Sequence, residues 1–267
     1  MQLLHDTFAK AASENRATLI AYLPAGFPTV DAGIAAITTV LDAGADIMEV
    51  GLPHSDPVLD GPVIQTADDI ALRGGLKIAD VMRTVRAAHR VTGKPVLVMT
   101  YWNPVSRYGI ERFAAELAEA GGAGCILPDL PVQESAEWRA QAAAHDLATV
   151  FVVAPSNTTE RLDAITSAAS GFVYASALMG VTGSREAAGE SAKTLVRRVE
   201  SATELPVCVG IGISDAARAA EVAAFADGVI VGSALVKALL DAPDETAGHA
   251  ALRSLTAELA AAVQRRE

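Results

Sequence analysis

Residues 46–65 read DIMEVGLPHSDPVLDGPVIQ, which is the pattern of a strand, a loop and the beginning of a helix. The first six residues form an apolar run typical of a short buried strand, and Glu49 is the one formal charge in its interior. A carboxylate in that position is costly unless it is paired, solvated or protonated. The loop that follows is rich in turn-forming residues and carries Asp60, and Pro62 is well placed to begin a helix. Glu49 and Asp60 could therefore face one cavity.

The same alternation of a short apolar run and an alanine-rich helical run continues along the chain. The predicted strands are 18–23, 46–51, 95–101, 124–129, 148–153, 171–176, 206–210 and 227–231. The predicted helices between and after them include 30–43, 78–91, 110–120, 133–145, 159–168, 192–202, 215–223 and 248–265. Strands that are apolar on both faces and are each followed by a helix indicate parallel pairing with right-handed crossovers.

Eight such units predict an α/β protein whose fold is a single (β/α)8 TIM barrel. We expect one domain over residues 1–267, because no Pro- or Ser-rich linker divides the chain, and an extra N-terminal helix over 1–12 that covers the base of the barrel. A doubly wound open sheet is the alternative. It is disfavoured because LPAG, at 23–26, stands where the G-x-G-x-x-G fingerprint would follow the first strand.

Composition narrows the classes of function. The chain is 51% hydrophobic and 20% charged, which suits a packed core, and its net charge of -11 argues against a nucleic-acid or anionic-membrane partner. The sequence has neither a spanning apolar run nor the pattern of a signal peptide, so we expect a cytoplasmic protein. Cys125 and Cys208 each lie in an apolar run, where buried free thiols are expected.

Active sites of this fold lie where the strands end at their carboxyl side, and the loops after the last two strands often bind phosphate. Here both of those turns carry glycine just before a helix, in VGIGIS and VIVGSALVK. Main-chain N–H groups of Gly212, Gly232 and Ser233, with help from Gly183, are candidates to bind an anion. The alternative is that these glycines only permit tight turns.

The charged residues limit the reactions that fit. A Schiff base needs a lysine at a strand end, and none of the lysines is so placed. A metal is also not expected, because His54 is the only histidine on that face. Acid–base catalysis remains, with Glu49 carrying a raised pKa in an apolar wall and Asp60 staying ionised in a wetter loop. The alternatives are a salt bridge at the barrel rim for Glu49 and a solvated surface acid for Asp60.

Several residues at the predicted strand ends could be plain core or could line an apolar pocket for a flat ring. They are Tyr22, Met99, Tyr101, Val152 and Ile211.

The motifs MEVGLPHSDPVLDGPVIQ, LPAGFPT, VMTYWNP, LPDLPVQES, ASALMGVTG, GIGIS and DGVIVGSALVK occur in this order. Together they resemble the tryptophan synthase alpha subunit family over nearly the whole chain. The resemblance implies a barrel that cleaves indole-3-glycerol phosphate to indole and glyceraldehyde 3-phosphate. It implies that Glu49 transfers the proton, that Asp60 binds the indole N–H and stabilises the cation, and that Tyr174 assists Glu49.

The resemblance also implies a partner, a pyridoxal-phosphate-dependent beta subunit in an αββα complex, and no cofactor in this chain itself. Thr182 and Gly183 would belong to a loop that closes over the substrate, with Thr182 bonded to Asp60. His54, Leu59 and Leu178 depart from the residues commoner in the family, which bears on loop closure. Two alternatives are a free-standing lyase that works without a partner and a catalytically silent regulatory barrel.

Overall fold

The computed structural model describes residues 1–176, 185–210 and 212–265, and its strands form one parallel sheet. The order along the sheet is β5-β4-β3-β2-β1-β9-β8-β7-β6, and every strand pairing in it is parallel. The strands are β1 (Thr18–Pro24), β2 (Ile47–Gly51), β3 (Val96–Met99), β4 (Gly124–Ile126), β5 (Ala148–Val150), β6 (Val152–Val153), β7 (Val173–Ser176), β8 (Val207–Gly210) and β9 (Gly228–Val231).

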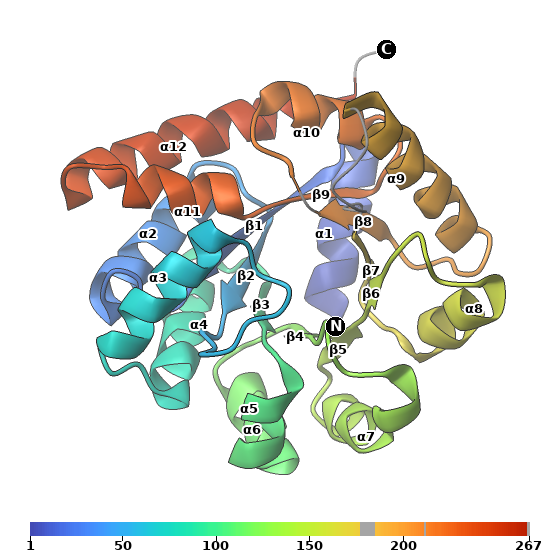
Figure 1. Ribbon diagram of the computed structural model, residues 1–267, viewed down its shortest axis with the longest axis horizontal. Coiled ribbons are helices and arrows are strands. Elements are labelled where there is room, and N and C mark those ends of the chain that lie inside the picture. Colours follow the sequence, from blue (N-terminus) through green and yellow to red (C-terminus); the bar gives the residue numbers. More distant parts are fainter. Residues whose placement is uncertain (177–184, 211, 266–267) are drawn as a thin grey trace.

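The sheet curls into a nearly closed barrel at a break in its fifth predicted strand. Residues 148–153 do not form one strand as expected, because Phe151 separates β5 from β6. On one side of the break Val150 accepts a hydrogen bond from the Leu127 N–H at 3.3 Å, and on the other Phe151 accepts one from the Tyr174 N–H at 3.1 Å. β5 thus pairs with β4, and β6 pairs with β7. Because β5 and β6 are the two ends of the sheet, the short break at Phe151 connects these ends (Figure 1).

Helices surround the barrel, and α1 covers its base as predicted (Figure 1). Thr29, Thr158, Asp215 and Asp244 cap α2, α8, α10 and α12 by accepting a backbone N–H with their side chains. The helices are α1 (Gln2–Ser13), α2 (Val30–Asp42), α3 (Pro62–Arg73), α4 (Ile78–Thr92), α5 (Trp102–Tyr108), α6 (Ile110–Glu119), α7 (Ala136–Ala144), α8 (Thr159–Ala168), α9 (Arg185–Glu200), α10 (Ala216–Ala223), α11 (Ser233–Leu240) and α12 (Glu245–Ala262), with a 3-10 turn, η1 (Val132–Glu134). No helix within the described ranges has the length and apolar character to cross a membrane.

The inside of the barrel is filled by every second residue of the strands. Successive side chains of a strand point to opposite faces, so Ile47 and Glu49 of β2 point inward while Met48 and Val50 pack against the helices. Inside, residues such as Ile20, Leu97 and Ile126 form one buried cluster with Leu4 and Phe8 of α1. A closed base leaves the opposite mouth of the barrel as the place for a site.

A partly buried ion pair links the segments that lead into the first two strands at the base. The guanidinium of Arg16 donates to both carboxylate oxygens of Asp46, at 2.6 and 2.9 Å, and their side chains are only 11% and 15% exposed. Asp46 also accepts the backbone N–H of Leu19 at 2.9 Å. The residue that begins the 46–65 stretch therefore fixes β2 beside β1.

We predict that Asp46→Ala lowers the free energy of unfolding by about 2 kcal/mol, because it leaves the partly buried Arg16 with only Glu14 as a counter-charge and removes the acceptor of the Leu19 N–H. The control is Asp31→Ala, which removes the partner of Arg83 in a pair whose side chains are 55% and 80% exposed and costs under about 1 kcal/mol. Urea unfolding followed by circular dichroism measures both. Equal losses in the two variants would contradict the anchoring role.

Candidate active site

Glu49 lies in the wall of the barrel between Tyr22 of β1 and Leu97 of β3, which are its register partners. It is 1% exposed, and in the described part of the chain neither carboxylate oxygen has a hydrogen-bond partner. No ion pair of Glu49 is found among the described residues, so the alternative of a salt bridge at the rim has no support there. Burial raises the pKa of Glu49 to about 8. The group can therefore give or take a proton near neutral pH.

Asp60 lies in the loop between β2 and α3 and is only half-buried. Its carboxylate accepts a hydrogen bond from the Tyr101 hydroxyl at 2.9 Å, and the same hydroxyl accepts the Leu59 N–H at 2.9 Å. Gln65 donates its side-chain amide to the Asp60 carbonyl at 2.7 Å. The loop is thus tied to the end of β3 and to the first turn of α3, so Asp60 is not a freely solvated surface acid.

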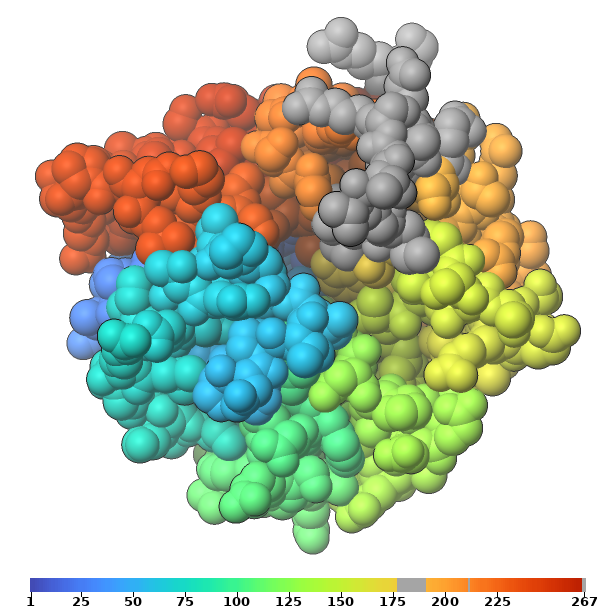
Figure 2. Space-filling model, in the orientation of Figure 1, coloured from blue at the N-terminus to red at the C-terminus, as the bar shows by residue number. Residues whose placement is uncertain are grey.

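Burial raises the pKa of Asp60 above its ordinary value, and the Tyr101 hydrogen bond and the charge of His54 oppose the rise. Asp60 is more exposed than Glu49, as expected of a loop residue, but its surroundings still raise its pKa. The ring of His54 lies over that of Tyr101, with centroids 5.0 Å apart. The loop and α3 lie beside the centre of the face shown in Figure 2.

Tyr22 and Tyr174 stand on two sides of Glu49. Burial raises the pKa of each hydroxyl well above its ordinary value, and the charge of Glu49 is among the further causes for both. A Cβ atom added to Gly51 would lie 2.3 Å from the Tyr22 hydroxyl, and one added to Gly210 would lie 2.1 Å from that of Tyr174. Glycine at these two strand ends therefore makes room for the tyrosine hydroxyls.

A small cavity opens between the ends of β1, β2 and β3 and the loop. It has a volume of ≈ 10 Å³ and is lined by Tyr22, Leu52, Asp60, Asp68, Met99, Thr100, Tyr101 and Pro128. Ligand pockets commonly measure about 300–1,000 Å³, so a bicyclic ring needs the loop to move outward. Of the predicted ring-pocket residues, the structure brings Tyr22, Met99 and Tyr101 together here, whereas Val152 lies on β6 and packs partly buried against the barrel interior.

The glycine turns after β8 and β9 lie at the same mouth of the barrel. Gly212 has φ 71°, a conformation that favours glycine, and Gly232 directly precedes α11. The first N–H groups of a helix have no acceptor within the helix, which leaves Ser233 available to an anion. A Cβ atom on Gly232 would meet Tyr22 at 3.2 Å, so this turn borders the cavity. Thr182, Gly183, Leu178 and Ile211 lie outside the described residues.

Asp68 is a site residue that the sequence reading missed. It lies on the buried face of α3 with Ile64, Ala67 and Ala71, is 3% exposed and lines the cavity beside Asp60. The signal was available in the helical period, because positions 64, 67, 68 and 71 share one face. Because a carboxylate on a buried helix face is costly, it predicts either a hydrogen-bond or ion-pair partner or a role in function.

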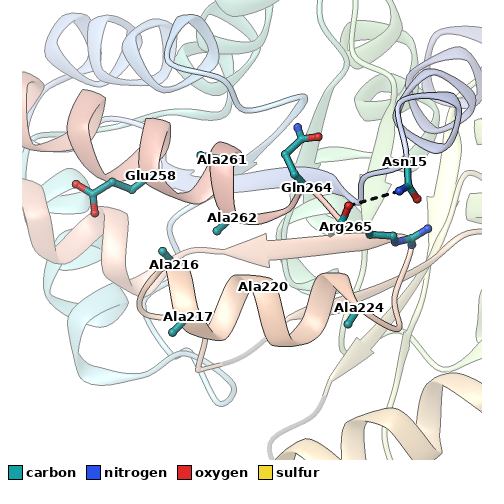
Figure 3. Close-up of a pocket in the computed structure, with 10 residues that line it drawn as sticks. All are labelled: Asn15, Ala216, Ala217, Ala220, Ala224, Glu258, Ala261, Ala262, Gln264 and Arg265. Atoms are coloured by element: carbon teal, nitrogen blue, oxygen red, sulfur yellow. Dashed lines mark hydrogen bonds between the residues drawn. The ribbon is translucent and has the colours of Figure 1, made fainter. Parts of the chain in front are cut away.

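A larger pocket lies elsewhere, in a groove of ≈ 880 Å³ between α10 and α12 on the outside of the barrel (Figure 3). Alanines such as Ala216 and Ala220 provide most of its lining, with Glu258 and Arg265 at its borders. None of the predicted site residues lines it. Its size therefore does not make it the candidate active site, because the three acids with raised pKa values, Glu49, Asp60 and Asp68, lie at the barrel mouth.

Comparison with known proteins agrees with this geometry. The family model described as tryptophan synthase alpha chain matches residues 8–264. A tryptophan synthase alpha chain from Streptomyces avermitilis is 73% identical over 263 residues, which cover 98% of this chain and 95% of that protein. A solved structure of Mycobacterium tuberculosis tryptophan synthase matches with a TM-score of 0.90, 49% identity and 98% coverage of each chain. A Legionella pneumophila tryptophan synthase subunit alpha matches with a TM-score of 0.90, 32% identity and 98% coverage of each. The chain therefore belongs to the tryptophan synthase alpha chain family.

Proposed function

We propose that this chain is a carbon–carbon lyase that cleaves indole-3-glycerol phosphate to indole and glyceraldehyde 3-phosphate, as the alpha subunit of tryptophan synthase in L-tryptophan biosynthesis. The observation that carries the proposal is the placement of Glu49. A carboxyl group with a pKa near 8 stands on a rigid strand, next to Tyr22 of β1. Tyr22 lines the cavity that also contains Asp60 of the loop. Family membership supplies the substrate.

Glu49 transfers the proton that makes the carbon–carbon bond breakable. Its carboxyl group donates a proton to C3 of the indole ring, and the ring becomes an indolenine cation. The Glu49 carboxylate then takes the proton of the substrate's glycerol hydroxyl next to the ring, which becomes the aldehyde. The bond to C3 breaks, and its electron pair restores the neutral indole. Tyr174 assists Glu49, and positioned acid–base groups suffice for this retro-aldol step.

Asp60 accepts the indole N–H and offsets the positive charge of the cation. The Tyr101 hydroxyl donates to the Asp60 carboxylate at 2.9 Å and so orients it toward the cavity when the loop is in place. Tyr22, Met99, Tyr101, Val152 and Ile211 surround the ring. The backbone N–H groups of Gly183, Gly212, Gly232 and Ser233 bind the phosphate.

We further propose a pyridoxal-phosphate-dependent beta subunit as the partner, with no cofactor bound by this chain. The loop around Asp60 presents Val58 and Leu59 with 80% and 60% exposure, which is apolar surface suited to a protein contact. Closure of this loop and of the one with Thr182 sequesters the substrate. We also propose that the chain forms a single domain, which its one sheet supports. Its place in the cytoplasm stays a prediction.

An indole-release assay with and without a beta subunit separates the alternatives. The proposed complex gives turnover that rises on adding the beta subunit, together with co-elution on size exclusion. A free-standing lyase gives turnover that is unchanged by the partner, with separate elution. A regulatory barrel gives no turnover in either case.

Glu49→Gln should lower the rate of indole release by about 10²–10⁴-fold, because the isosteric amide has no proton to transfer. Binding of glycerol phosphate, measured by calorimetry, should be retained because it depends on the turns after β8 and β9. A variant with near-normal turnover would sink the mechanism, and loss of ligand binding would mean a structural role.

Asp60→Asn should reduce indole release at least tenfold without changing the circular dichroism spectrum, because the cation loses its counter-charge. Asp56→Asn is the matched control, since Asp56 is an exposed acid of the same loop whose carboxylate bonds only its neighbour Ser55 in the described structure. We expect the control to keep its rate within about twofold. Similar losses in both variants would point to a loop effect instead.

Glycerol phosphate should compete with the substrate, raising the apparent KM in proportion to its concentration and leaving kcat unchanged. The physical reason is that the ligand occupies the main-chain donors without filling the ring cavity. Steady-state kinetics at several ligand concentrations tests this. An absence of competition would remove the phosphate site from the proposal.

A further inference from the structure

Asp68 is a buried acid for which the mechanism above has no use. Its side chain projects from the second turn of α3, it is 3% exposed, and within the described residues its Oδ1 atom has no hydrogen-bond partner. A buried carboxylate with an unpaired oxygen is costly to keep in a structural position. This one lines the same cavity as Asp60 and Tyr22.

The surroundings of Asp68 bring no described counter-charge to it. The loop side has Asp60 and His54, whose backbone N–H favours the ionised form, and β1 presents the Tyr22 hydroxyl. The helix α11 also packs against α3, but its one charged residue, Lys237, is paired with Asp241 and is 61% exposed. The described lining of the cavity contains two carboxyl groups and no basic side chain.

An acidic, mostly apolar cavity favours a ring that becomes positive. Two carboxyl groups in one small space do not both ionise easily, and the group that loses its proton second carries a raised pKa. Burial and the charge of Asp60 together raise the pKa of Asp68 to about 7. Asp68 thus changes charge in the pH range in which the lyase is proposed to work.

We propose that Asp68 supplies a second negative charge beside Asp60, placed where the substrate ring becomes positive during carbon–carbon cleavage. This inference rests on the proposed lyase function. The charge acts on the cation and hardly on the neutral substrate, so it lowers the barrier without improving binding. Asp68 therefore acts on kcat, and its effect grows as the group ionises.

The test compares kcat and KM of wild type and Asp68→Asn for indole release between pH 5.5 and 9. At about pH 7.5, Asp68→Asn should lower kcat by about tenfold, the size expected for one unit charge a few ångströms away, with KM within about twofold. In wild type kcat should rise through about pH 7, and this rise should be absent in the variant. Asp68→Glu should restore part of the rise.

The control is Asp69→Asn, which alters the next residue of α3, an acid 56% exposed and paired with Arg73. Its pH profile should match wild type. An unchanged kcat profile in Asp68→Asn would overturn the inference, and so would parallel losses in stability, kcat and KM, which indicate a structural role. Absence of turnover in wild type would instead overturn the proposed function.

A second measurement does not depend on turnover or on Asp68→Asn folding well. In NMR spectra of protein labelled with ¹³C at the aspartate carboxyl groups, the Asp68 resonance is assigned as the one that disappears in Asp68→Glu. In wild type this resonance should titrate near pH 7. In Asp60→Asn the same resonance should titrate at lower pH, because the neighbouring charge is gone. Titration near the ordinary aspartate value of 3.8 in wild type would overturn the inference.

Discussion

The site depends on one constraint, the alternation of side chains along β2. Ile47 and Glu49 share the inner face of the barrel, where the other strands provide apolar residues and no described group pairs with the carboxylate. The same burial that keeps Glu49 rigid raises its pKa to about 8. The position of Glu49 and its high proton affinity therefore both come from its place on the inner face of β2. A one-residue shift in the register of β2 would turn Glu49 outward and remove both.

Glycine and tyrosine at the strand ends adapt the barrel mouth to this acid. The hydroxyl groups of Tyr22 and Tyr174 occupy the space that side chains at Gly51 and Gly210 would fill. Both hydroxyls lie within the influence of the Glu49 charge, which contributes to their raised pKa values. The loop that carries Asp60 is joined to the end of β3 chiefly by the hydrogen bonds of the Tyr101 hydroxyl. We infer a division of labour in which the strand holds the proton donor and the loop brings the counter-charge.

The repeated apolar runs were enough to predict the barrel, its closing helix and the inward position of Glu49, because strand and helix periods are local properties. The break at Phe151 was not predictable, since it depends on where the sheet meets itself. The Asp60–Tyr101 bond joins residues 41 positions apart, so local pattern predicted Asp60 as a site acid but could not predict the hydroxyl group that donates to it. Asp68 was missed because an acid beside Asp69 in a helix reads as surface until the apolar face is traced.

The central claim is that Glu49 is a neutral, buried acid at physiological pH. Infrared difference spectra between pH 5 and 10 follow the carbonyl stretch of protonated carboxyl groups directly. Wild type should lose a band with a midpoint near pH 8 that is absent from Glu49→Gln. If that Glu49-dependent band is lost near the ordinary value of 4.5 instead, Glu49 is already ionised at neutral pH and the account is contradicted.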